Sequence, residues 1–271
     1  MKDELKLYYD ENLNIFGNPQ SYNKVKLYPI QLKDVKYQSL FYQILAHPKM
    51  YIADFEILKA SYFKFYLLAI HRAEDNIQED LKDFIKYITH ANSVDIKYKQ
   101  IPNKESLSAI SFKIILNEED GEDKQIILTE EDFDNIREIY LEMNGLSVEY
   151  IEEYNPELEK HLEFLTRNTV GMTLSDEIFT FCAVMKIPIQ EIENYTLFQF
   201  KTHFEKLINL KEYDLYKPLV VSGQITKKGG GELEIKSYMY KSGQHGRYDA
   251  IKMDKDSFFA KNKDALSAPF E

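Results

Sequence analysis

Apolar residues recur three and four positions apart through the stretch from Thr173 to Gly223, which is the spacing of amphipathic helices. Thr196 is followed three residues later by Gln199, the pattern of a capping box, and Thr173 is followed by Asp176, which approximates one. The pattern predicts helices that begin at the two threonines and pack on a shared core. The apolar positions are Ile178, Phe181, Cys182 and Met185 after the first threonine, and Leu197, Phe200, Phe204, Leu207 and Ile208 after the second.

Two prolines occur within this stretch and are expected to interrupt its helices. Pro188 separates the two helices, because proline removes a backbone hydrogen bond from a helix interior. Residues 188–194 are therefore predicted to form a short helical turn. Pro218 is predicted to end the helix that begins at Thr196, or to open a last short helix that ends at Gly223.

The same helical pattern occurs in the first half of the chain and again after residue 129. It predicts a helix from Asp34 to just before Pro48 and a nearly all-apolar helix from about Asp54 to Ile70. A further helix is predicted from Thr129 to a stop at Asn144 and Gly145. Two more are predicted around Leu81, Phe84, Ile85 and Ile88, and from Pro156 through Leu158, Leu162 and Leu165.

From Val94 to Tyr98 and from Ile110 to Leu116 the apolar residues alternate with polar ones, which is typical of strands. Three short strands are predicted near residues 94–98, 110–116 and 124–128, with the polar loop 117–123 as a hairpin tip. The expected fold class is α+β, mainly helical, with a small antiparallel β-hairpin module in the middle. The predicted regions are 1–92 (helical), 93–145 (hairpin plus helix), 146–223 (helical) and 224–271, a flexible basic tail.

The net charge and the cysteine content make some functional classes less suitable for this chain than others. The net charge is −11 and the isoelectric point is about 5.2, so the chain would repel phosphate backbones, and we expect no nucleic-acid ligand. Cys182 is the single cysteine, predicted as a buried small hydrophobe. No apolar run has the length of a membrane span, and the charged N-terminus lacks a signal-peptide core. We expect a cytoplasmic location, without membrane contact.

Residue patterns predict no catalytic, metal or cofactor site. The six histidines are scattered and lack the spacing of a zinc site. The acidic loop 117–123 lacks the ligand order of a calcium loop, and the glycines after Lys228 lack the order of a phosphate-binding loop. A non-enzymatic protein is expected, although an active site built from residues distant in sequence stays open.

The C-terminal tail contains basic and aromatic residues among glycines, in a chain that is otherwise acidic. Such a segment could dock on an acidic partner or on the body of the protein, or be an ordinary solvated tail. The candidate partner-binding residues are Lys227, Lys228, Arg247 and Tyr248.

Four stretches of the chain form loose patterns that occur together in one group of proteins: Lys26–Ile30, Phe133–Gly145, Tyr195–Phe200 with Glu212–Tyr216, and Gly246–Ile251. Together they resemble proteins encoded among the tail genes of tailed phages of low-GC Gram-positive bacteria. The resemblance is closest to tail assembly chaperones, although the small β module departs from the simplest helical members. It implies a non-enzymatic, acidic, helical protein that keeps the tape-measure protein soluble while tail-tube subunits polymerise.

Other functional classes remain open at this stage. The same features fit a structural virion component, such as a tail or connector subunit, and a phage protein that binds and inhibits a host factor. Homo-oligomerisation is compatible with each of them. The expected partners are phage tail proteins, namely the tape-measure and tail-tube proteins, with no cofactor.

Overall fold

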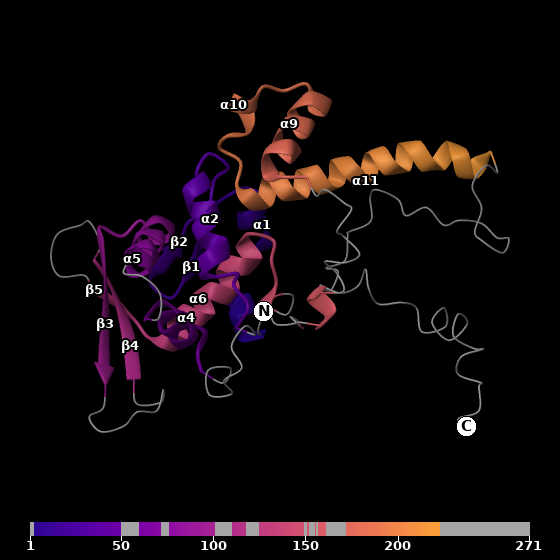
Figure 1. The fold of residues 1–271 in the computed structure, drawn as a ribbon. Coiled ribbons are helices and arrows are strands. Elements are labelled where there is room, and N and C mark those ends of the chain that lie inside the picture. Colours follow the sequence, from indigo (N-terminus) through magenta and orange to yellow (C-terminus); the bar gives the residue numbers. More distant parts are fainter. Residues whose placement is uncertain are drawn as a thin grey trace, which may run out of the picture.

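The fold is mainly helical, with two small antiparallel sheets (Figure 1). A computed structural model describes residues 3–49, 60–71, 76–100, 110–117, 125–148, 151, 155, 157–160 and 172–222. The N-terminal elements are the 3₁₀ helix η1 (Asp3–Tyr8), α1 (Glu11–Ile15), β1 (Gln20–Tyr22), β2 (Val25–Leu27), α2 (Val35–Ile44), α4 (Tyr62–His71) and α5 (Asn76–Thr89). The remaining ones are β3 (Ser93–Gln100), β4 (Ile110–Asn117), β5 (Gln125–Leu128), α6 (Glu130–Met143), α9 (Leu174–Met185), α10 (Ile189–Ile192) and α11 (Leu197–Val221).

The predicted α+β class is confirmed, and the three predicted strands form one antiparallel sheet in the order β3-β4-β5. Its register pairs Ile96 with Ile114 and Ile114 with Leu128. The second sheet is the two-stranded β1–β2 hairpin, in which Gln20 lies opposite Leu27. No local sequence pattern predicted this pairing, which depends on the turn at residues 23–24.

The main hydrophobic core lies between the three-stranded sheet and the helices packed beside it, α2, α4, α5 and α6 (Figure 1). Tyr140 of α6 is fully buried there, and its ring makes edge-on contacts with Phe41 and Phe84 at 6.0 Å between centroids. This core takes residues from both predicted regions 1–92 and 93–145. The proposed division into domains stays a prediction.

Local capping sets the start of α6 as predicted. The Thr129 side chain accepts from the Asp132 backbone N–H, and the Asp132 carboxylate accepts from the Thr129 backbone N–H at 2.9 Å. The helix ends at Asn144, and Gly145 follows with φ of +77°, a conformation that glycine adopts without strain. The predicted start and stop are therefore both confirmed.

The predicted helix from about Asp54 is wrong as one continuous element, because α4 begins at Tyr62. Its N-terminus is fixed from α6: the Asp134 carboxylate accepts the backbone N–H groups of Tyr62 and Phe63 at 2.9 and 3.0 Å. The Ser61 hydroxyl also accepts from the Lys64 backbone N–H. These contacts satisfy N–H groups that a helix start leaves without partners. Residues 54–59 of the predicted helix lie outside the described residues.

The predicted break at Pro218 is also wrong, since α11 continues through it to Val221. A proline interrupts one backbone hydrogen bond, the one to the carbonyl four residues earlier. That carbonyl belongs to Asp214, and residues 214–217 are exposed, so water can take the place of the missing donor. The Pro218 carbonyl still accepts from the Ser222 backbone N–H at 2.9 Å.

Candidate protein-binding surface

Helices α9, α10 and α11 form a unit with its own small core. Both predicted threonine caps are present as reciprocal capping boxes, Thr173 with Asp176 and Thr196 with Gln199. The predicted helical turn after Pro188 is α10. Hydrogen bonds that these caps supply fix where each helix begins and how its apolar face is directed. The buried core residues are Leu32, Phe181, Ile192, Leu197, Phe200 and Leu207.

The unit joins the rest of the protein through a short pairing of extended segments. Gln31 and Thr196 form an isolated antiparallel bridge. Around it, the Leu32 N–H donates to the Tyr195 carbonyl and the Leu197 N–H donates to the Ile30 carbonyl, both at 2.9 Å. This pairing directs α11 away from the main core, and Figure 1 shows the helix projecting beyond the body of the protein.

The apolar stripe of α11 continues past the part of the helix that is covered. Phe204, Ile208 and Leu215 are four and seven residues apart, so they lie on one side of the helix. Phe204 packs against the small core, Ile208 is 36% exposed and Leu215 is 60% exposed. With 25 residues the helix is about 37 Å long, and no described residue after Leu207 is buried in it. We call Phe204, Ile208 and Leu215 the α11 stripe.

Helix α9 carries exposed apolar side chains as well. Met185 follows Phe181 by four residues on the same side of the helix, yet Phe181 is buried and Met185 is 49% exposed. Phe179, on another side, is 63% exposed. The prediction of a buried Cys182 needs correction, because its side chain is only partly covered. Cys182 packs against the edge of the small core, next to the buried Phe181, and is not enclosed by it.

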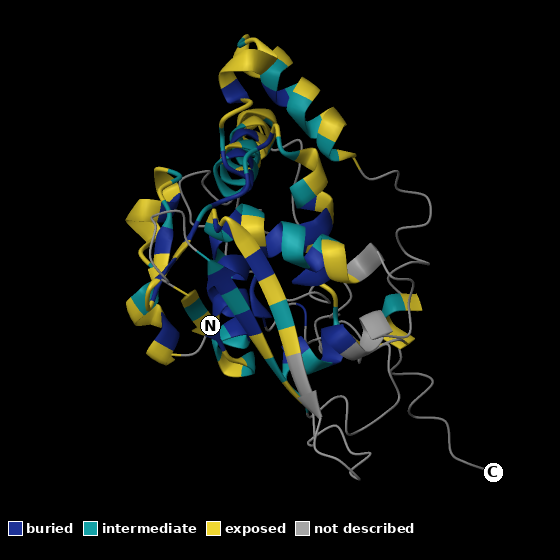
Figure 2. Cartoon of the chain, turned by 90° about the vertical axis from the view of Figure 1, so that its left-hand side faces the viewer, coloured by how far each residue is buried: buried dark blue, intermediate teal, exposed yellow. Residues whose placement is uncertain are grey.

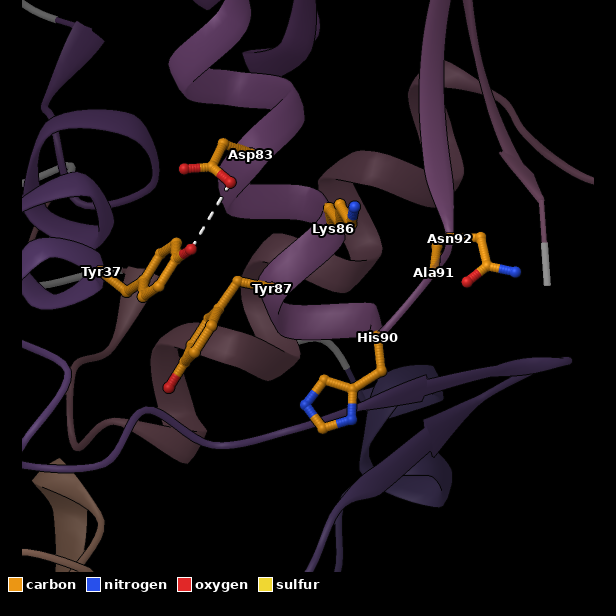
Figure 3. A pocket seen from close by; sticks show the side chains of 7 residues that line it. All are labelled: Tyr37, Asp83, Lys86, Tyr87, His90, Ala91 and Asn92. Atoms are coloured by element: carbon orange, nitrogen blue, oxygen red, sulfur yellow. Dashed lines mark hydrogen bonds between the residues drawn. The ribbon is translucent and has the colours of Figure 1, made fainter. Parts of the chain in front are cut away.

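A separate hollow of about 330 Å³ lies where α5 meets β3 and faces α2 (Figure 3). The rings of Tyr37 and Tyr87 stack there with centroids 3.7 Å apart. The Tyr37 hydroxyl donates to Asp83 at 3.5 Å, and Asp83 also forms an ion pair with Lys36. The hollow is lined by Tyr37, Asp83, Lys86, Tyr87, His90, Ala91 and Asn92.

The polar groups of this hollow hold α2 against α5. The Tyr87 hydroxyl donates to the Asp34 carboxylate at 2.6 Å. Burial, together with this hydrogen bond to Asp34, raises the pKa of Tyr87, and burial followed by the Asp83 charge raises that of Tyr37. Both hydroxyls therefore stay protonated and act as donors at neutral pH. Their chemistry is that of a structural contact between helices.

The predicted absence of metal and membrane sites is addressed only for the described part of the chain. No group of three or more His, Cys, Asp or Glu residues with metal-binding geometry occurs among the described residues. In the same part, no helix is long and apolar enough to cross a bilayer. The predicted partner-binding residues Lys227, Lys228, Arg247 and Tyr248 lie outside the described residues.

Sequence reasoning placed Ile208 and Met185 on helix faces that pack on a core, and so it missed the surface that they form. The signal available was a difference in length: the helix that begins at Thr196 is predicted to run as far as Pro218, whereas the facing helix α9 spans 12 residues. A long apolar stripe opposite a short partner leaves part of itself uncovered.

Comparison with protein families gives a match to part of the chain. A model of the YomV second domain, a phage-associated family of the Bacillus phage SPBc2 YomV type, matches residues 166–242. The matched range includes α9, α10 and α11, and it is consistent with a phage protein. No curated protein and no solved structure matches the chain.

Proposed function

We propose that this chain is a non-enzymatic phage morphogenesis protein that binds another protein through the α11 stripe. The observation that carries the proposal is the rise in exposure along Phe204, Ile208 and Leu215 on a helix that projects from the body. Exposed apolar groups that repeat on one side of a helix suit the apolar face of a second helix or a groove. The match of residues 166–242 to a phage-associated family supports the phage origin in this proposal.

Within phage morphogenesis, the role we propose is that of a tail assembly chaperone. Its partner would be the tape-measure or tail-tube protein before assembly, when apolar faces of that protein lack their final neighbours. The net charge of −11 keeps such a complex dispersed, because like-charged particles repel each other. The exposed hydrophobic side chains then supply the contact, and the acidic surface supplies the solubility.

The test is co-purification with the tape-measure and tail-tube proteins expressed in the same cells. Leu215→Glu and Ile208→Glu place a charge in the stripe and should reduce recovery of the partner at least tenfold, since tenfold requires only about 1.4 kcal/mol and a buried unpaired charge costs more than that. Asn209→Glu adds the same charge on a different side of α11 and should leave recovery unchanged. Loss of recovery in all three variants, or in none, would contradict binding through the stripe.

A further inference from the structure

Strand β3 has one edge without a partner strand in the described structure. β4 pairs with it along Ser93–Gln100, and no other described strand lies on its far side. Figure 2 shows β3 at the front of the molecule, with exposed and buried residues alternating along it. An eight-residue edge of this kind presents backbone donors and acceptors to another strand.

The direction of those backbone groups follows from a contact on the next strand. The Phe112 N–H of β4 donates to the Glu130 carboxylate at 2.9 Å, and so it does not serve β3. Phe112 lies opposite Tyr98, which makes the two a pair without mutual hydrogen bonds. By the alternation of antiparallel strands, the N–H and C=O groups of Tyr98, Ile96 and Val94 point to the open edge.

The other side of the sheet offers a much shorter edge to an added strand. β5 is only four residues long and pairs with the end of β4, from Ile114 to Asn117. In the part of β4 that β5 does not pair with, the Phe112 N–H already donates to the Glu130 carboxylate. Short edge strands and covered donors are devices that prevent pairing with another chain. The edge of β3 is therefore the place where the sheet can grow.

Charges on the outer face of β3 select a partner for this edge. Lys97 lies directly opposite Lys113 of β4, and both side chains are exposed, so two like charges face each other. Asp95, also exposed, is two residues from Lys97 on the same face. A strand that places a carboxylate beside Lys97 on its open side would balance this repulsion.

We propose that β3 pairs antiparallel with β3 of a second copy of this chain, about a two-fold axis at Ile96. In this register Asp95 lies opposite Lys97 of the second copy, and Lys97 lies opposite its Asp95. Val94 lies opposite Tyr98, and both of those residues direct backbone groups to the shared edge. The contact is symmetric and closes as a dimer with a six-stranded sheet, because each copy offers the same three-stranded sheet.

Sedimentation velocity of the full chain over a concentration series tests the pairing. The wild type should form dimers. Asp95→Lys and Lys97→Asp each oppose like charges across the axis and should weaken dimerisation roughly tenfold or more. An equimolar mixture of the two variants should recover it, because every pair then joins Asp with Lys. Lys24→Asp, in the exposed turn of the β1–β2 hairpin, is the matched control and should behave as the wild type.

Recovery in the mixture cannot arise from variants that fail to fold, so this result separates pairing from instability. The proposal is overturned if the wild type is monomeric throughout the series. It is also overturned if the single variants dimerise as the wild type does, or if their mixture stays as weakly associated as each variant alone.

Discussion

The Gln199 side chain ties the start of α11 to the end of α1, because its amide Nε2 donates to the Ile15 carbonyl oxygen at 2.8 Å. Its Oε1 atom accepts the Thr196 backbone N–H at 2.8 Å and so completes the capping box. One side chain thus sets where the helix begins and holds the helix to the N-terminal part of the protein. The position of the α11 stripe relative to the body depends on this residue.

The two roles of Gln199 can be separated by substitution. Gln199→Glu keeps the acceptor for Thr196 and loses the donor to Ile15, and we expect a loss of about 1 kcal/mol in the free energy of unfolding. Gln199→Ala loses both contacts and should cost about 2 kcal/mol. Urea denaturation gives both values. Equal stability of Gln199→Glu and the wild type would mean that the tie to Ile15 contributes nothing, and equal stability of the two variants would mean that the cap on Thr196 contributes nothing.

Two glycines next to α11 should differ in their tolerance of alanine. Both have positive φ, but a Cβ at Gly17 would lie 3.0 Å from Thr196 Cγ2, whereas one at Gly145 would meet Phe198 at an ordinary 3.7 Å. The backbone strain of about 1 to 2 kcal/mol is common to both substitutions. We expect Gly17→Ala to lower the melting temperature more than Gly145→Ala does. The reverse order would show that the body is not closely packed against Thr196.

Alkaline pH should destabilise the protein through Tyr62. Burial raises the pKa of this phenol to about 12 from an ordinary value near 10, and its hydroxyl donates to the Ile44 and His47 carbonyls. Between these two pH values the unfolded chain releases the proton and the folded chain keeps it. The stabilisation is therefore complete below pH 10 and is lost as the pH rises towards 12, by about 2 to 3 kcal/mol.

The measurement is the free energy of unfolding at several pH values from 9 upward, for the wild type and Tyr62→Phe. The variant should be less stable at neutral pH, because the buried Ile44 carbonyl loses its donor. Its stability should then fall less steeply above pH 10. A parallel fall in both proteins would assign the alkaline loss to other groups, such as Tyr9, whose pKa burial also raises to about 12.

Asp134 should stabilise the start of α4 from a distance of more than seventy residues in sequence. Asp134→Ala leaves the N–H groups of Tyr62 and Phe63 without an acceptor, and we expect a loss of about 2 kcal/mol. Asp134→Asn retains one acceptor and should lose less. Hydrogen exchange at Phe63 is the site-specific measurement, and unchanged protection in the alanine variant would contradict the capping role.

Features that depend on neighbouring residues could be predicted from the sequence. Thr129, Thr173 and Thr196 each have their capping partner three positions away, so the starts of their helices could be predicted from the sequence. Alternation of apolar and polar residues located β3 and β4, and the short run at residues 124–128 located β5. The start of α4 could not be predicted from the sequence, because the residue that caps it, Asp134, lies on another helix. The Gln31–Thr196 bridge also joins segments far apart in sequence, and no local pattern indicates it.

The α11 stripe was visible as an apolar pattern, but its exposure was not. Whether Leu215 is covered depends on how far α9 extends beside α11 and on the continuation of the helix through Pro218. Both are properties of the assembled fold. The same pattern therefore predicted a core helix, where the structure has a helix that is covered over its first half only.

Quantitative mass spectrometry of purified virions beside the infected-cell lysate tests the proposed chaperone role most directly. The protein should be abundant in the lysate and absent from virions, because a chaperone leaves its client on assembly. A fixed copy number in purified virions would contradict that role and would identify the chain as a structural subunit.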